Sequence, residues 1–344
     1  MRLEVERRTV RLTAPIATAY GELTERTLLA VSVTDDDGAV GHGEAAPLEP
    51  YDGVGVQRAE QALASYAPVV ARSQGLNGAQ LLDACRQVDD LPVALAAIDL
   101  ALWDLAGRVR GLPLAQLITD DPAPEAAVNA SVSALDRAGV AEQAAAAVAA
   151  GFGCVKLKVG LGDDAGRVAA ARAAAGPDVE LRLDANGAWD VEQAVATIDA
   201  LAPAGLELVE EPVHGLRLVR EVRERVAVRI AIDETAGEHG ALGAGVADAV
   251  CLKISRCGGI SGLIAAAALV RAAGAEPYLA STYDGPLGIA AGVHAAAALA
   301  SRGPVPACGL ATLELFDGID NPLPARDGRI AVPRRPGLGV EPLA

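Results

Sequence analysis

The chain has little positive charge, few cysteines and no long apolar run. Its 45 Asp and Glu residues outnumber its 29 Lys and Arg residues, which gives a formal net charge of −16 at pH 7. A surface of this sign repels nucleic acids and anionic membranes, so we expect neither as a partner. A small anionic substrate is not excluded, because it responds to the local field of its binding site.

The cysteines predict neither a disulfide framework nor a zinc site. They are odd in number, and no CxxC motif occurs, so buried thiols in a reducing cytosol explain them more simply. The start "MRLEVERRTV" is too charged for a signal peptide, and stretches such as "SGLIAAAALV" fall short of the ~20 residues that cross a bilayer. We therefore expect a soluble cytoplasmic protein. The five cysteines are Cys85, Cys154, Cys251, Cys257 and Cys308.

The first third of the chain is typical of an α+β domain. "TLLAVSVTDDDGAVGHGEAAP" predicts a hairpin that turns at residues 36–38. Helical patterns follow over residues 56–71 and 92–111, and the second ends at a glycine with Pro113 beyond it. We expect a capping domain over residues 1–125.

After "DDPAPEAA", short strand patterns alternate with alanine-rich helical segments. Their starts lie roughly 20 to 30 residues apart, about the length of a strand–helix unit. Eight such units favour a closed (β/α)8 barrel over residues 126–318, within an α/β fold, although an open doubly wound sheet stays possible. The tail, residues 319–344, should return to the capping domain. The predicted strands are 128–132, 154–158, 180–184, 207–210, 229–233, 249–253, 276–281 and 306–310.

Charged side chains fall at the ends of five consecutive predicted strands. In a barrel, the carboxyl ends of the strands meet at one face, where reactive groups lie. Lysines flank three strands that end in carboxylates. A lysine pair alone is more often a solvated strand edge, and Asp184 or Asp233 alone would cap a helix; the joint pattern favours catalysis. The set comprises Lys156 and Lys158, Asp184 and Asn186, Glu210, Asp233, and Lys253.

The three carboxylates predict a metal site. Asp184, Glu210 and Asp233 would repel one another at close range unless a cation lay between them. Ligands that are all oxygen suit a hard ion, so we expect Mg²⁺, or Mn²⁺ in its place. Such an ion stabilises the charge that develops on a substrate carboxylate when the neighbouring proton leaves.

The two neighbouring lysines predict a general base. Side chains two residues apart on a strand share one face, so Lys156 lies beside Lys158. A second ammonium group and a divalent cation both disfavour the charged form of Lys158 and lower its pKa. Lys158 would then act as the base, Lys156 would tune it, and Lys253 would face the opposite side of the substrate.

At these residues the sequence resembles the enolase superfamily, specifically its muconate-lactonizing-enzyme subgroup. "VKLKVG" is similar to the subgroup's KxK motif, "LDANGAW", "VEEP" and "AIDET" to its metal-ligand motifs, and "DAVCLKISRCGGISG" to its opposing-lysine strand. The resemblance extends to "GHGEAAP" and "PGLGV". It implies Mg²⁺-dependent removal of a proton α to a carboxylate through an enediolate. Strand seven, "EPYLAST", lacks the histidine of the mandelate racemase branch.

The resemblance also bears on the substrate, which we expect to be a small carboxylate. Two lysines suit either a racemase or a syn dehydration. Dipeptide epimerases of the subgroup typically carry an acidic DxD at strand eight, whereas this chain has Gly309 and Ala311 there. "CGLATLELF", "VNASV" and "GEAAPLEPY" look like o-succinylbenzoate synthases of menaquinone synthesis. N-acylamino acid racemase, dipeptide epimerase and muconate cycloisomerase stay open.

Further residues are expected around the substrate. Segments 18–22 and 47–53 of the cap should close as lids. Outside the family, a Schiff-base aldolase or a non-catalytic binding protein would also fit a barrel lysine. We also expect a homo-oligomer. The residues predicted to line or support the substrate site are Asn186, Ser281, Asp284, Tyr20 and Tyr51.

Overall fold

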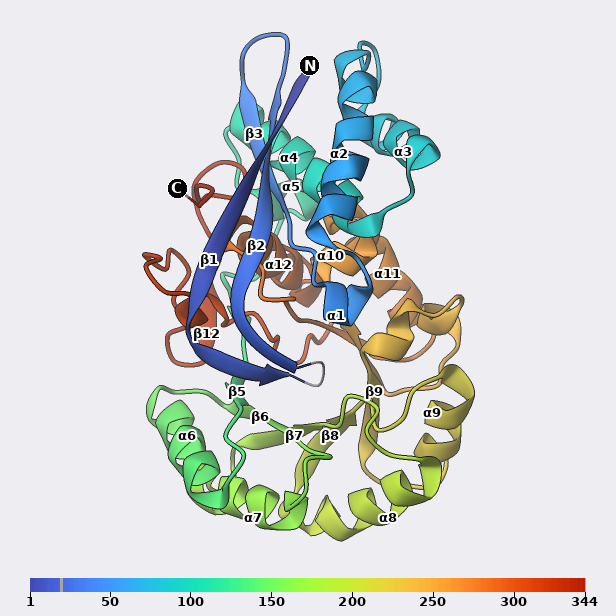
Figure 1. The fold of residues 1–344 in the computed structure, drawn as a ribbon, viewed down its shortest axis with the longest axis vertical. Helices are drawn as coiled ribbons and strands as arrows, with labels where there is room; N and C mark the ends of the chain where they lie inside the picture. The colour runs from blue at the N-terminus through green and yellow to red at the C-terminus, as the bar shows by residue number, and fades with distance from the viewer. Residues whose placement is uncertain (19–20, 344) are drawn as a thin grey trace.

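A computed structural model of the chain describes residues 1–18 and 21–343. A cap formed by the first third of the chain lies over a barrel of parallel strands (Figure 1). The cap sheet is antiparallel in the order β1-β2-β3 and contains the predicted hairpin as β2 and β3. Its strands are β1 Arg2–Thr18, β2 Gly21–Thr34 and β3 Val40–Ala45.

Four elements of the cap, β1, α1, α3 and α5, lie outside the predicted set. β1 is rich in charged residues and largely exposed, and it alternates apolar and polar residues only over residues 2–6 and 9–13. It pairs with β2 almost from end to end. α3 begins at a capping box between Asn77 and Gln80. The predicted helix over 92–111 is α4, which ends where Gly111 adopts φ 69°. The cap helices are α1 Glu49–Asp52, α2 Val56–Ala71, α3 Gly78–Val88, α4 Pro92–Arg110 and α5 Leu114–Ile118.

Seven parallel strands form the barrel sheet in the order β11-β10-β9-β8-β7-β6-β5. Neighbours along the chain are neighbours in the sheet, as strand–helix repeats require. They coincide with the first seven predicted strands to within a few residues. The strands are β5 Ala130–Val132, β6 Cys154–Lys158, β7 Glu180–Asp184, β8 Leu206–Glu210, β9 Arg229–Ile232, β10 Ala249–Leu252 and β11 Glu276–Leu279.

The eighth predicted strand closes the barrel through two isolated bridges. Cys308 pairs with Val128 at one edge of the sheet, and Gly309 pairs with Ala280 at the other. Backbone hydrogen bonds of 2.8 Å (Cys308 N to Ala127 O) and 2.7 Å (Gly309 N to Leu279 O) support this closure. The fold is therefore a (β/α)8-type barrel and not an open doubly wound sheet.

Helices cover the outside of the barrel, and α12 is the most deeply buried. Every residue of α12 from Pro286 to Leu299 is buried. A helix that is apolar all round must pack on several sides; α12 contacts α5, α11 and β3. No helix in residues 1–18 and 21–343 is long and apolar enough to cross a membrane. The barrel helices are α6 Arg137–Ala149, α7 Asp164–Ala175, α8 Val191–Leu201, α9 Leu216–Arg223, α10 Ile254–Cys257, α11 Ile260–Ala272 and α12 Pro286–Ala300.

The C-terminal tail contacts both parts of the chain. Its strand β12 Arg329–Ala331 pairs with β4 Glu125–Ala127. Farther on, Leu338 N donates a 2.7 Å hydrogen bond to Asp104 Oδ1 in α4 of the cap. The boundaries at residues 125/126 and 318/319 stay a prediction.

Asp104 should be a strong stabilising contact between these parts. Its buried carboxylate also accepts hydrogen bonds from His42 N in β3 (2.8 Å) and from Arg108 (2.7 Å). Asp104→Ala leaves two backbone N–H groups unpaired, so we expect the free energy of unfolding to fall by about 3 kcal/mol. Urea unfolding measures this fall. As a control, Asp83→Ala removes an exposed ion pair with Arg86 and should cost under about 0.5 kcal/mol; equal costs would contradict this prediction.

Candidate active site

The predicted catalytic residues converge at the carboxyl ends of the barrel strands. In the sheet register, Lys158 of β6 lies opposite Asp184 of β7, which lies opposite Glu210 of β8. Asp233 follows β9 directly, and Lys253 follows β10 directly. The strand register therefore places all five side chains around one end of the barrel.

Lys156 lies between two of the carboxylates. Its Nζ is 2.8 Å from Glu210 Oε1 and 3.0 Å from Asp184 Oδ2. Burial by itself would lower the pKa of Lys156, but Asp184 and Glu210 outweigh burial and raise the pKa well above its ordinary value. Lys156 therefore stays an ammonium group.

Lys158 is in a different electrostatic environment. Its Nζ donates a 3.0 Å hydrogen bond to Asn186 Oδ1 and makes no ion pair among the described residues. Burial and then the charge of Lys156 lower the pKa of Lys158, against the opposing effect of Asp184. Burial, not the second ammonium group, is the larger cause. A lysine with a lowered pKa is suited to accept a proton.

Asn186 is held in position by its backbone. It adopts φ 44°, a left-handed conformation that asparagine tolerates better than most residues. Its N–H donates to Asp184 Oδ1 (3.0 Å), and its Nδ2 donates to Glu234 Oε1 (3.1 Å). Asn186 thus connects a predicted metal ligand to the predicted base.

Lys253 and Asp233 form a buried pair on the other side of the barrel. They are in direct contact, and Lys253 Nζ is also 2.9 Å from Tyr51 Oη. Burial lowers the pKa of Lys253, but Asp233 and the other neighbouring groups together outweigh burial and raise the pKa of the lysine. Tyr51 belongs to α1, so the cap segment 47–53 reaches the barrel residues.

The carboxylates fit a divalent cation. Glu210 is fully buried, and its Oε2 has no hydrogen-bond partner in the described chain. Buried polar atoms nearly always have partners, so this oxygen points to a ligand. Burial raises the pKa of Glu210, and a cation would reverse that effect. Oxygen atoms of Asp184, Glu210 and Asp233 supply the hard donor set that Mg²⁺ prefers.

Comparison with known proteins decides the family. Residues 2–119 match the family "Mandelate racemase / muconate lactonizing enzyme, N-terminal domain", and residues 139–344 match "Enolase C-terminal domain-like". The L-Ala-D/L-Glu epimerase of Bacillus subtilis (strain 168) is 32% identical over 99% of this chain and 96% of its own length. The chain belongs to the enolase superfamily, in the muconate-lactonizing-enzyme subgroup.

Other enolase-superfamily relatives differ in their reactions. The o-succinylbenzoate synthase of Thermobifida fusca (strain YX) is 39% identical over 60% of this chain and 66% of its own length. A dipeptide epimerase from Enterococcus faecalis V583, solved with Mg and L-Leu-L-Tyr, has a TM-score of 0.89 and 27% identity over 98% of both chains. The protein is thus an enzyme of this superfamily, and its solved relatives include proteins that bind Mg.

Several residues of the candidate active site were not predicted from the sequence. The carboxylate of Glu211 accepts hydrogen bonds from Asp233 N (2.8 Å) and Thr235 N (3.0 Å), so it fixes the start of the segment after β9. Arg256 donates to Tyr51 Oη (2.8 Å) and to Asp233 O (3.1 Å). The second glutamate of "VEEP" and the arginine three residues after Lys253 were the available sequence signals.

A buried polar cluster joins the cap to the barrel beside the site. Glu44 Oε1 accepts a 2.6 Å hydrogen bond from Gly285 N at the start of α12. Burial and the neighbouring Asp284 raise the pKa of Glu44 to about 8. Arg26 Nη1 donates to Pro47 O (2.7 Å) at the base of the lid segment. Glu44 lies in "GHGEAAP", which contributes to the family resemblance. No role was predicted for its carboxylate.

The other residues predicted to line the substrate site lie in different parts of the structure. Ser281, just after β11, lies with its Oγ 3.0 Å from Thr312 Oγ1. Asp284 is buried in the cap–barrel cluster, where it accepts a 2.7 Å hydrogen bond from Thr282. Tyr20 lies outside the described residues, as do parts of the first predicted lid. Their roles in substrate binding stay predictions.

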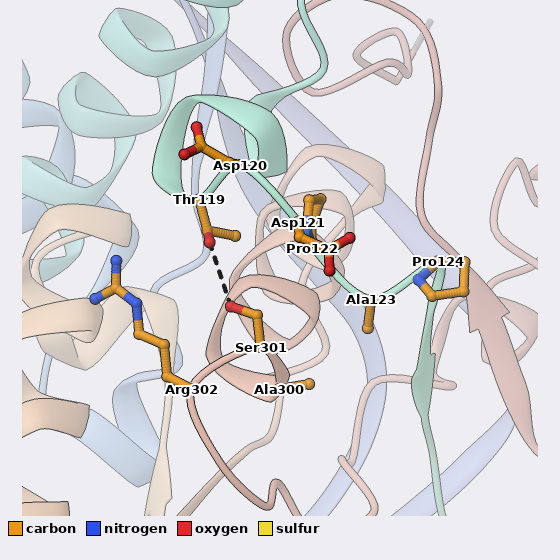
Figure 2. Close-up of a pocket in the computed structure, with 9 residues that line it drawn as sticks. All are labelled: Thr119, Asp120, Asp121, Pro122, Ala123, Pro124, Ala300, Ser301 and Arg302. Atoms are coloured by element: carbon orange, nitrogen blue, oxygen red, sulfur yellow. Dashed lines mark hydrogen bonds between the residues drawn. The ribbon is translucent and has the colours of Figure 1, made fainter.

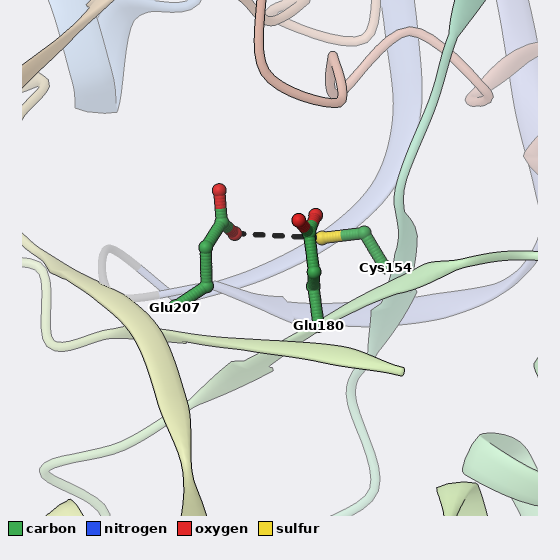
Figure 3. Close-up of side chains that lie close together, drawn as sticks. All are labelled: Cys154, Glu180 and Glu207. Carbon is green, nitrogen blue, oxygen red and sulfur yellow. Dashed lines mark hydrogen bonds between the residues drawn. The ribbon is translucent and has the colours of Figure 1, made fainter. Parts of the chain in front are cut away.

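Two other features, a cluster around Cys154 and a surface cavity, lie away from the candidate active site. At the amino ends of the strands, Cys154 lies near Glu180 and Glu207, with Sγ 3.7 Å from Glu207 (Figure 3). Arg182 already holds Glu207 through two 3.0 Å hydrogen bonds. A cavity of about 490 Å³ lies between residues 119–124 and 300–302, where Thr119 and Ser301 are hydrogen-bonded (Figure 2). Neither feature includes a predicted catalytic residue.

Tyr51 should matter for turnover at this candidate site. Its hydroxyl donates to Asp233 Oδ1 (2.8 Å) and contacts Lys253 and Arg256, so it fixes the lid to the barrel. Hydrogen bonds to charged groups contribute about 1.5–3 kcal/mol each, so Tyr51→Phe should lower kcat/KM roughly 10- to 100-fold. Tyr66→Phe is the matched control, since the Tyr66 hydroxyl donates to Asp89 O within the cap, away from Asp233 and the lysines. Equal kcat/KM for the two variants would contradict a role for Tyr51.

Proposed function

We propose that the protein is a Mg²⁺-dependent o-succinylbenzoate synthase, which removes a proton α to a carboxylate and then eliminates water. The observation that carries the proposal is the uncharged end of the eighth strand. Gly309 and Ala311 occupy it, and the nearby polar pair is the hydroxyls of Ser281 and Thr312. A substrate ammonium group buried here would lack a carboxylate partner at a cost of several kcal/mol.

Asp184, Glu210 and Asp233 would hold the ion. Bound there, Mg²⁺ supplies positive charge that stabilises the substrate carboxylate as negative charge develops on it. The uncompensated Glu210 Oε2 supports this assignment. Lys156, which contacts both Asp184 and Glu210, would orient these two carboxylates and keep the second ammonium near Lys158.

Lys158 performs the proton transfers. Its neutral amine takes the proton from the carbon α to the carboxylate, and the electron pair of that bond moves toward the carboxylate. The carbon–oxygen bond of the leaving hydroxyl then breaks on the same face. The ammonium of Lys158 returns the proton to that hydroxyl, so water leaves and the charge balances. Lys253, across the barrel, stabilises the developing negative charge.

A second candidate is an N-acylamino acid racemase. Its supporting observation is that Lys158 at the end of β6 and Lys253 just after β10 lie across the barrel from each other, as deprotonation on one face and reprotonation on the other require. Such a substrate is also a carboxylate without a free ammonium group, so the end of strand eight suits it equally. A dipeptide would carry the ammonium group that this site leaves unpaired.

Relative kcat/KM values test the proposal. The three substrates are the cyclohexadiene precursor of o-succinylbenzoate, a set of N-succinylamino acids, and a set of dipeptides. Dehydration is followed in the ultraviolet, and the other two reactions by deuterium exchange at the α carbon. We expect dehydration to be fastest and dipeptides to be slowest. Fastest exchange with N-succinylamino acids would establish the second candidate, and fastest exchange with dipeptides would refute the argument from strand eight.

A further inference from the structure

A buried thiol lies directly beneath the predicted metal ligands. Cys251 precedes Lys253 by two residues on β10, so both side chains point to the same side of the strand. Cys251 is 3% exposed, and its Sγ is 3.7 Å from Lys253 Nζ. No role for this thiol is predicted from the sequence, because the groups that surround it come from other strands.

The thiol lies within reach of two carboxylates. One donor atom each of Glu210, Asp233 and Cys251 lie within 4.8 Å of one another, and all three residues are buried. In a tetrahedral site, metal–ligand bonds of about 2.0 to 2.3 Å set the ligand atoms of one ion roughly 3.3 to 3.8 Å apart. Side-chain movements of about 1 Å therefore suffice to bring the three atoms onto one ion.

Two polar atoms, one in this group and one beside it, point to a ligand. Glu210 Oε2 and Tyr278 Oη have no hydrogen-bond partner in residues 1–18 and 21–343. Both side chains are at most 1% exposed, and the Tyr278 hydroxyl lies within electrostatic range of Glu210 and Cys251. Buried groups of this kind are rare unless a ligand or water satisfies them.

We propose that Glu210, Asp233 and Cys251 form a second metal-binding mode of this site, selective for thiophilic divalent cations such as Zn²⁺ and Cd²⁺. A thiolate prefers borderline and soft ions, whereas Mg²⁺ takes oxygen ligands. On binding, the S–H bond of Cys251 breaks, its proton leaves to solvent, and the sulfur bonds to the ion. Because Glu210 and Asp233 also belong to the Mg²⁺ site of the proposed function, a thiophilic ion excludes Mg²⁺ and stops turnover.

Cadmium spectroscopy tests this inference without any substrate. In the wild-type protein, Cd²⁺ should produce the ultraviolet charge-transfer absorption of a cadmium–thiolate bond, saturating at one equivalent. Cys251→Ser should remove this absorption and weaken Cd²⁺ binding by at least about tenfold, the lower end of the effect of outer-shell changes. Cys154→Ser is the matched control: its thiol is also buried beside carboxylates, but Arg182 occupies Glu207. That variant should keep the absorption.

Two results of the cadmium experiment would contradict a site at Cys251. An absorption that persists in Cys251→Ser, or none in the wild-type protein, would overturn the inference. Cys251→Ala provides the same test if the serine variant does not fold, with circular dichroism as the check of folding. The proposed dehydration plays no part in the readout, so its failure would leave the cadmium result intact, and the reverse also holds.

Discussion

Lys158→Ala should lower kcat by roughly 10²- to 10⁴-fold, the usual contribution of a positioned general base. Lys158 is the site lysine with a lowered pKa, and its Nζ contacts Asn186 rather than a carboxylate. No other described amine at these strand ends is free of an ion pair, since Lys156 and Lys253 both contact carboxylates. The measurement is steady-state turnover of the best substrate at saturating Mg²⁺.

Two controls show whether the loss of turnover in Lys158→Ala reflects loss of the general base. The Mg²⁺ affinity of Lys158→Ala should stay near the wild-type value, because the lysine is not a predicted ligand. Lys253→Ala should also lower kcat. In a racemase it should abolish racemisation of both enantiomers and leave α-proton exchange by Lys158 for one of them, whereas in a dehydratase it should slow the single reaction. If Lys158→Ala retained full turnover, the assignment of the base would be wrong.

Glu210→Gln should remove most Mg²⁺ binding and turnover together. The substitution keeps the shape of the side chain but removes the charge of a fully buried carboxylate. Asp184 and Asp233 then remain as the charged ligands, and the side chain at position 210 offers the ion only an uncharged amide oxygen. Because changes to outer-shell groups alone cost 10- to 100-fold in metal affinity, loss of a ligand's charge should cost about 100-fold or more. Calorimetric titration with Mg²⁺ measures the affinity.

The matched control is Glu180→Gln. Glu180 is exposed at the opposite end of the neighbouring strand β7, so its loss should leave Mg²⁺ affinity and turnover unchanged. Excess Mg²⁺ should restore part of the turnover of Glu210→Gln, as expected when affinity is the main loss. Unchanged Mg²⁺ affinity in Glu210→Gln would place the ion elsewhere.

Much of the barrel could be predicted from the sequence because its signals are local. Each inner strand is a short apolar run that ends in a polar residue, as in "LRLDANG", and parallel strands bring such ends to one face. The sequence therefore predicts correctly that Lys158, Asp184 and Glu210 lie in one row at the ends of neighbouring strands. Their catalytic and metal-binding roles stay predictions.

The features that were missed depend on contacts between distant parts of the chain. β1 alternates apolar and polar residues only over residues 2–6 and 9–13, and its ladder with β2 stabilises the rest of the strand. Glu44 contacts Gly285 across 241 residues, and Arg256 contacts Tyr51 across 205. A single charged residue in a loop or strand does not reveal such a partner. The eighth strand was predicted over 306–310, but only Cys308 and Gly309 pair with their neighbours.

The most direct test of the account is the dehydration rate as Mg²⁺ is titrated into EDTA-treated enzyme. We expect no turnover without the ion and, at saturation, a kcat/KM above roughly 10⁴ M⁻¹s⁻¹ for the cyclohexadiene precursor, within the range of physiological reactions. Turnover at full rate in EDTA would contradict the metal-dependent mechanism. No turnover with Mg²⁺ shown to be bound would contradict the assignment as an o-succinylbenzoate synthase.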